Sequence, residues 1–573
     1  ILHLPQVEAS FYWRSVFGQP LFRKLEVPNA EITVRRIDQG VYDIAGFVLN
    51  FNDTARRDAE NSSLFTDWLL RQGRIDVTSC KLRFQDLTAK PRARTTTLEN
   101  INLTFEKNVS SYRAGIQGEL AGRHENRIDI RTKFTAPLFG DRSWKTWSGE
   151  LFFGADNLDV ARLTRPIPAA RKLLKSGRGS TRTWLKFQDG NPSELTSYLG
   201  LSDVLLTFSK DAEPLQVKTL STRLSETLDR GELHAKAENL NFELSDGTTA
   251  QNLLLQTIVH MDSTPDAATH RSGFSVAQLD VETLKQLLPS VPFPKAAADL
   301  IRMHEASGTI SNLEVSWLGS PGNTQDWRIK TDFSGLTVAH NSPEDAKLIF
   351  SGFENLSGSL EVANKHGHVS FATKKGAVSI PGVFETPRLS VDSLTGAVNW
   401  QLTRPAGSDK ERLAIAFDNI AVSNEDLSVS VHGTWQQNET AAGRIDLSGQ
   451  IERLQADRAW RYMPFAVPEN VRRWLQGGLV SGKAQNGTFE LRGDLVKYPW
   501  VGLHKDDGHF IVSAELKDAA IDYVPSMKVL DDGNFERAAH WPLLTDIQGR
   551  LIFEGASMTV LADTAKTHGA TVS

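Results

Sequence analysis

The stretch "LSVSVHG" (427–433) alternates apolar and polar residues with a period of two. Leu427, Val429 and Val431 occupy every second position, and serine or histidine follows each apolar residue. Because successive side chains of a β-strand point to opposite faces, this pattern predicts a strand with one apolar face and one wet face. Strands of this kind are typical of antiparallel sheets.

The same alternation recurs along the chain. It is found in "NLEVSWLG" (312–319), "HFIVSAEL" (509–516) and "RLIF" (550–553). Glycine and asparagine separate such runs, as in "ANKHGHVSF" (363–371), which is the pattern of successive hairpins. The sequence therefore predicts a mainly β protein built on an antiparallel sheet.

Helical patterns are few by comparison. The four predicted helical stretches are 63–73, 158–177, 279–303 and 454–478. The last three share one order, in which a short helix, a pair of prolines, a second short helix and a glycine precede a strand.

This order indicates an internal repeat. Gly308 and Gly319 are separated by 11 positions, and so are Gly482 and Gly493. Copies this far apart are supersecondary modules rather than the rungs of a short-repeat solenoid. We expect an N-terminal segment followed by three modules that each begin with a helix pair, with bounds 1–157, 158–278, 279–453 and 454–573.

Composition excludes several classes of protein. The 573 residues are enough for several structural units, and 40% hydrophobic content is that of an ordered chain. Lys and Arg number 64 against 69 Asp and Glu, so no basic excess favours a nucleic-acid partner. Cys80 is the single cysteine, which excludes an internal disulfide and a cysteine-based zinc cluster.

The ends of the sequence suggest a piece of a longer protein. It opens at "ILHLPQVEAS" without an initiator methionine, and no apolar run reaches the ~20 residues that span a bilayer. We expect any membrane anchor or signal to lie upstream.

One stretch resembles a phosphate-binding loop. Gly477 is followed by four residues and then Gly482-Lys483, but Ala484 stands where serine or threonine would hold magnesium. A phosphate loop runs from strand to helix, whereas here the helix comes first. The sequence instead predicts that Gly482 ends a helix and turns the chain into a strand.

No motif of catalysis or metal binding stands out. His366 and His368 would share one strand face, yet no second histidine or carboxylate pair accompanies them, so a hairpin turn is the simpler interpretation. There is no G-x-S-x-G elbow and no dinucleotide fingerprint. We expect a protein without enzymatic activity, cofactor or metal.

The balance of strands and helices leaves the covering of the sheet open. A half-apolar sheet must bury its apolar face against another layer. The few short helices cannot cover strands spread over so long a chain. Either the sheet closes on itself as a sandwich or barrel, or it forms a trough whose apolar lining meets a non-protein partner.

Three stretches resemble the AsmA-like proteins, in particular the large YhdP group of Gram-negative envelopes. The last of them has that group's recurring order of a proline-flanked helix, Trp-Leu, glycine, strand, glycine and an aromatic-proline pair. The stretches are "PLFRKLEVPNAEITVRRIDQGVYDIAGF" (20–47), "WLLRQGRIDVTSCKLRFQD" (68–86) and "YMPFAVPENVRRWLQGGLVSGKAQNGTFELRGDLVKYPW" (462–500).

The resemblance implies a bridge-like lipid carrier that works by solvation, without catalytic residues. Its fold would be a long, highly twisted antiparallel sheet curled into an apolar groove, with a few short helices bracing or capping the edge. Such proteins are held in the inner membrane by one N-terminal helix, absent from this sequence, and extend through the periplasm toward the outer membrane. Their partners are phospholipids and both membranes, with envelope proteins as further candidates, and they support the outer-membrane permeability barrier.

The groove lining implied by this resemblance consists of the apolar positions of the alternating strands. Each of them could equally be an ordinary core residue. The predicted lining residues are Ile75, Val77, Leu82, Phe84, Leu240, Phe242, Leu313, Val315, Trp317, Leu360, Val362, Val369, Phe371, Leu427, Val429, Val431, Phe489, Leu491, Val512, Leu516, Leu551 and Phe553.

Two other functions stay open from the sequence. One is a structural or assembly factor that uses strand edges to aid insertion of outer-membrane proteins. The other is an enzyme acting on envelope glycans, which would need a convergent carboxylate pair. For the lipid carrier, we expect Val315→Asp or Val429→Asp to block lipid passage while the protein still folds.

Overall fold

The computed structural model covers most of the chain. It describes residues 2–572 except for positions 18–19, 39, 45–46, 51–67, 89–93, 122, 138–143, 160–172, 209–211, 230–231, 261–270, 292, 304, 319–325, 340–351, 405–410, 440–441, 466, 499, 501–503, 505, 526, 530–534, 538–540 and 556.

The chain divides into two compact units. Unit 1 holds residues 1–275 with the short segments 289–292 and 319–322, and unit 2 holds the remainder, from residue 276 to 573. Strand β17 (Arg271–Asp280) contains the boundary. The predicted division into four modules stays a prediction.

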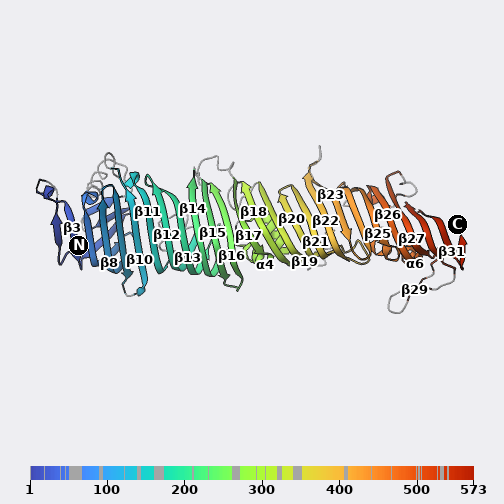
Figure 1. The fold of residues 1–573 in the computed structure, drawn as a ribbon, viewed down its shortest axis with the longest axis horizontal. Helices are drawn as coiled ribbons and strands as arrows, with labels where there is room; N and C mark the ends of the chain where they lie inside the picture. The colour runs from blue at the N-terminus through green and yellow to red at the C-terminus, as the bar shows by residue number, and fades with distance from the viewer. Residues whose placement is uncertain are drawn as a thin grey trace. The chain divides into compact units, whose positions relative to one another are not determined.

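Most of unit 1 is a meander in which each strand is antiparallel to the next in the chain (Figure 1). Its strands are β7 (Arg74–Asp86), β8 (Arg94–Asn108), β9 (Ser111–Leu120), β10 (Arg123–Thr135), β11 (Ser148–Asp159), β12 (Leu174–Gln188), β13 (Asn191–Leu206), β14 (Leu215–Asp229), β15 (Glu232–Leu244) and β16 (Thr249–His260).

The N-terminal edge of unit 1 departs from the antiparallel pattern. Strands β3 (Phe22–Pro28) and β4 (Glu31–Asp38) both run parallel to β7, one after the other along the same edge. A parallel pair needs a long crossover connection, which the segment between β4 and β7 supplies. The other elements of unit 1 are β1 (Leu2–His3), β2 (Glu8–Phe11), β5 (Val41–Ile44), β6 (Phe47–Asn50), and the 3₁₀ turns η1 (Trp13–Phe17) and η2 (Trp144–Thr146).

Unit 2 contains a second antiparallel meander (Figure 1). Its strands are β18 (Glu305–Leu318), β19 (Trp327–Ala339), β20 (Gly352–Ala363), β21 (His366–Ser379), β22 (Arg388–Thr403), β23 (Arg412–Ser423), β24 (Leu427–Gln436), β25 (Arg444–Gln455), β26 (Leu479–Asp494), β27 (Gly508–Ile521), β30 (Leu544–Glu554), β31 (Ser557–Thr567) and β32 (Ala570–Val572). Strands β28 (Met527–Val529) and β29 (Phe535–Arg537) pair only with each other among the described strands.

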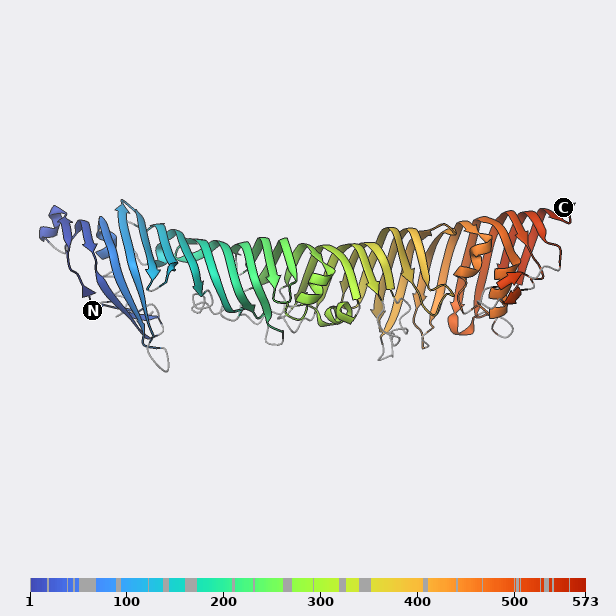
Figure 2. The same cartoon turned by 90° about the horizontal axis from the view of Figure 1, so that it is seen from below.

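Two of the predicted helix pairs are confirmed, both in unit 2, where Figure 2 shows short helices against the strands. The first pair is α4 (Val281–Leu287) and α5 (Lys295–Met303). The second is the 3₁₀ helix η5 (Ala456–Tyr462) and α6 (Glu469–Gly478), and a short turn, η6 (Leu495–Lys497), follows β26.

The other two helical predictions hold only in part. Residues 68–71 of the predicted helix 63–73 are helical, and 63–67 lie outside the described residues. The prediction for 158–177 is wrong at both described ends, because 158–159 belong to β11 and 174–177 to β12. Pairing with the next strand, as between Leu174 and Leu206, prevails over the local helical pattern there.

Thirteen of the described strands in the two units each contain one non-glycine residue in the left-handed backbone conformation, with φ between 47° and 55°. Most of these residues lie at a shift in strand register, which marks a β-bulge. A bulge bends its strand and increases the local twist, and asparagine and aspartate tolerate this conformation best. The residues are Ser79, Asn100, Asn157, Asp203, Asn239, Asn252, Asn312, Asn355, Lys375, Asn419, Asn486, Asp518 and Asp546.

Repeated bulges explain why the sheets curl. No pairing among the described strands joins the first strand of a meander to its last, so neither meander closes into a barrel. The predicted fold class, a mainly β, curled antiparallel sheet with few short helices, is confirmed.

The predicted role of Gly482 as the end of a helix is wrong. Helix α6 already ends at Gly478, and Gly482 lies inside β26 with φ 112°. An added Cβ at this position would overlap Ala519 on the neighbouring strand, so the glycine permits a close approach of two backbones. Gly308, its counterpart in the repeat, likewise has a positive φ of 130° and faces the backbone of Gly335 and Leu336.

The bulge at Asn419 offers a test of this account. Asn419 is exposed and has φ 47°, a conformation that costs a β-branched residue about 1–2 kcal/mol more than glycine. We expect Asn419→Val to lower the midpoint of urea unfolding and Asn419→Gly to leave it nearly unchanged. Equal midpoints for the two variants would contradict the role assigned to the bulge.

Candidate functional site

The strand register places the apolar residues of unit 2 on one face. Residues directly opposite each other in a sheet share a face, so the pairings can be followed from strand to strand. Three rows result, and none of their residues is charged. They are Val315, Ile329, Val362, Gly367, Trp400, Ile415, Trp435 and Ile445; Leu360, Val369, Val398, Phe417, Gly433, Leu447, Leu491 and Phe510; and Ile420, Val431, Gly449, Phe489, Val512, Phe553 and Met558.

Unit 1 has an apolar face of the same construction. Two of its rows run from β7 to β16, and they contain several hydroxyl-bearing residues and one carboxylate. The rows are Val77, Leu103, Ile116, Ile130, Phe153, Thr183, Ser197, Leu224, Ala237 and Leu255; and Ile75, Phe105, Ala114, Thr132, Leu151, Leu185, Leu195, Glu226, Ala235 and Thr257.

The predicted lining residues differ in exposure. Seven are buried, and the other fifteen are half-buried although they are large and apolar. The seven buried residues are Ile75, Leu313, Val315, Trp317, Leu427, Leu516 and Leu551. Half-burial across so many neighbouring strands leaves an apolar surface that the described protein covers only in part.

Packing by helices accounts for several of the buried positions. Leu516 and Leu551 belong to one core cluster with Leu475 of α6 and Ala459 of η5. Ile75 packs with Leu70 in a cluster at the beginning of unit 1. Elsewhere on the same strands, Val512 and Phe553 stay half-buried, so η5 and α6 cover only part of the apolar face.

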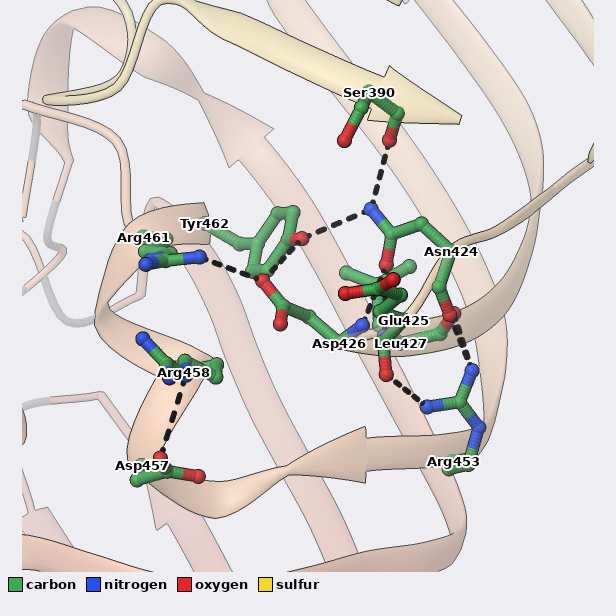
Figure 3. A network of polar contacts seen from close by, with 10 residues as sticks. All are labelled: Ser390, Asn424, Glu425, Asp426, Leu427, Arg453, Asp457, Arg458, Arg461 and Tyr462. Atoms are coloured by element: carbon green, nitrogen blue, oxygen red, sulfur yellow. Dashed lines mark hydrogen bonds and ion pairs between the residues drawn. The ribbon is translucent and has the colours of Figure 1, made fainter. Parts of the chain in front are cut away.

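A polar network fixes η5 to the sheet of unit 2 (Figure 3). The Tyr462 hydroxyl donates to Asp426 Oδ2 (3.1 Å), and Arg461 pairs with the same oxygen (3.2 Å). Asn424 Nδ2 reaches both the Tyr462 hydroxyl (3.0 Å) and the Ser390 carbonyl (2.9 Å). Burial raises the pKa of Tyr462, so this hydroxyl stays protonated and acts as a structural donor.

Aromatic rings lie over glycines on the apolar face. An added Cβ at Gly367 would overlap the ring of Trp400 in the next strand, and one at Gly449 would overlap Phe489. Each ring fills the space that the glycine leaves empty. An aromatic ring from the next strand therefore stands where each glycine lacks a side chain.

The opposite face is mainly polar, although in unit 1 it also carries the exposed rings of Trp184 and Tyr198. Cross-strand ion pairs occur there, such as Arg492 with Asp446 (3.0 Å) and Arg388 with Glu354 (2.6 Å). Exposed pairs of this kind contribute little to stability individually. Their main effect is to keep this face hydrated, which distinguishes it from the apolar face.

No candidate active site emerges in the part of the chain that the structure describes. It contains no group of three or more histidine, cysteine or acidic residues that could hold a metal ion. Burial raises the pKa of Cys80, which makes it an unreactive thiol. The prediction of a hairpin turn for the two histidines is wrong, because His366 and His368 lie in β21, where His368 Nδ1 is 2.7 Å from Asn399 Oδ1.

Several residues of the apolar rows were missed from the sequence. On β22 and β23 these include Val398, Trp400 and Phe417, although "GAVNWQL" (396–402) carries the same alternation. In unit 1, hydroxyl residues such as Thr183 interrupt the apolar pattern and conceal the strand face. Glu226 could have been noticed as an acidic residue in phase with Leu224.

These features define the chain as a curled antiparallel sheet protein with one hydrated face and one partly exposed apolar face. It belongs to the YhdP protein family, whose model matches residues 1–573. No curated protein and no solved structure matches the chain. None of the described helices is long and apolar enough to span a membrane.

The exposure of the lining residues revises the expectation for charge insertion. Val315 is only 1% exposed, so an aspartate there would be buried without a partner. We expect Val315→Asp to lower the free energy of unfolding by about 3 kcal/mol or more. Val429→Asp, at a half-buried position, should cost clearly less in the same urea titration. Equal losses would contradict the difference in cover between these two positions.

Proposed function

We propose that this protein carries phospholipids between the inner and outer membranes of a Gram-negative envelope, along the apolar faces of its curled sheets. The proposal also places it in the periplasm, anchored to the inner membrane through a segment outside this sequence, and gives it a part in the outer-membrane permeability barrier. Membership of the YhdP family supports an envelope lipid-transport role. The observation that carries the proposal is the set of half-buried, uncharged rows on one face of the sheet.

The physical reason lies in the cost of exposing hydrocarbon to water. Each methylene group transferred into an apolar environment gains about 0.8 kcal/mol. An acyl chain can therefore leave the membrane interior at low free-energy cost only if another apolar surface receives it. Rows that run across many strands offer such a surface, while the charged headgroup stays in water.

Apolar rows that cross many strands fit transport better than storage. A single deep pocket would hold one lipid tightly and release it slowly. The rings of Trp400 and Phe489 continue the apolar surface beside Gly367 and Gly449. Without catalytic groups in the proposed path, solvation is the whole of the mechanism.

Charge placed on the apolar face tests the proposal. An aspartate at the half-buried Val429 would oblige passing acyl chains to contact a carboxylate. His432 lies on the same strand, but it is exposed and its side chain is on the opposite face of the sheet. His432→Asp is therefore the matched control. We expect Val429→Asp to slow transfer of a fluorescent phospholipid between vesicles at least about tenfold, and His432→Asp to leave it unchanged.

Unfolding midpoints measured for both variants separate this effect from loss of fold. Transfer by Val429→Asp at the rate of the unmodified protein would contradict the proposal. If, in addition, crosslinkers placed at strand edges captured envelope proteins, the assembly-factor hypothesis would be favoured instead.

A further inference from the structure

Glu226 is the one charged residue in the two rows traced across unit 1. It lies on β14, directly opposite Leu195 of β13 and Ala235 of β15. Paired residues share a face, so its side chain is on the apolar side of the sheet, and it is half-buried there. A carboxylate in this position is unusual, because ionised groups are costly away from water.

The charge of Glu226 is not compensated by the described protein. None of the described residues donates a hydrogen bond to it or forms an ion pair with it, and burial alone raises its pKa. Carboxylates on the opposite face of the neighbouring strands are paired, as Glu194 is with Lys186 (2.7 Å) and Glu243 with Lys218 (2.7 Å). Glu226 therefore lacks the cation that its neighbours have.

A largely buried run of hydroxyl groups lies on the same face of the sheet, and its last member is two positions from Glu226. Thr181 Oγ1 lies 2.9 Å from Thr183 Oγ1, which lies 2.8 Å from Ser197 Oγ on the next strand. Ser197 is opposite Leu224, two positions from Glu226 on the same face. The two hydrogen bonds use two of the three hydroxyl hydrogens, so this run has one hydrogen left to donate.

We propose that Glu226 and this hydroxyl run form a subsite for the headgroup of a phospholipid that carries a primary ammonium. Glu226 pairs with the ammonium, and the run donates to a phosphate oxygen. The inference rests on the proposed function and gives it a preferred cargo. Such a lipid complements this part of the sheet in charge and in polarity. Its ammonium supplies the cation that Glu226 lacks, and its acyl tails can contact Leu195 and Leu224.

The preference for the ammonium headgroup should weaken as the pH falls. Among the described groups that face Glu226, namely Leu195 and Ser197 of β13, Ala235 of β15 and Leu224 of its own strand, none titrates. The subsite requires the ionised carboxylate. Selection for the ammonium headgroup is therefore present above the pKa of Glu226 and is lost as the pH falls through it.

The experiment incubates the purified chain with vesicles of phosphatidylethanolamine and phosphatidylglycerol in equal amounts and with identical acyl chains. Mass spectrometry then measures the ratio of the two lipids recovered with the protein. We expect enrichment of phosphatidylethanolamine of about two- to fivefold, the range for a partly exposed ion pair. Glu226→Gln should abolish the enrichment without reducing total lipid, and lowering the pH should remove the enrichment from the unmodified protein.

Glu194→Gln is the matched control, because it removes the same charge from the opposite face of the adjacent strand. It should retain the enrichment. Unchanged enrichment in Glu226→Gln, or equal loss in Glu194→Gln, would overturn the subsite. Recovery of neither lipid from the unmodified protein would instead overturn the proposed function on which the subsite rests.

Discussion

Cross-strand register is the constraint on which the rest of the structure depends. Pairings such as Val369 with Val398, and Val398 with Phe417, keep apolar side chains on one face through successive strands. A slip of one residue would turn every side chain of a strand to the opposite face. The protein has few helices to cover that face, so the same register that forms the sheet also creates its partly exposed apolar surface.

Two local devices shape this surface. Bulge residues such as Asn355 and Asn419 bend the strands, which curls the meander without closing it. Glycines such as Gly482 let neighbouring backbones approach where the curl is tight, and others accept an aromatic ring from the next strand. Helices η5 and α6 cover one part of the face in unit 2 and are fixed there by the network around Asn424 and Tyr462.

The sequence predicted the strands well because the period of two is a local property. It predicted the partly exposed face less well, since alternation is the same whether or not a helix covers the strand. Val315 and Val429 alternate alike, yet only Val315 is fully buried. Gly482 was misinterpreted because its conformation depends on Ala519, which is distant in the sequence.

The central claim is that the apolar face, and not the polar face, meets hydrocarbon. A photo-crosslinking residue placed in turn at positions 396–401 of β22 tests this directly, because Val398 and Trp400 lie on the apolar face and Asn399 and Gln401 on the other. In the presence of phospholipid vesicles, the account predicts lipid adducts at Val398 and Trp400 and almost none at Asn399 and Gln401. Equal adducts on both faces, or none at any position, would contradict it.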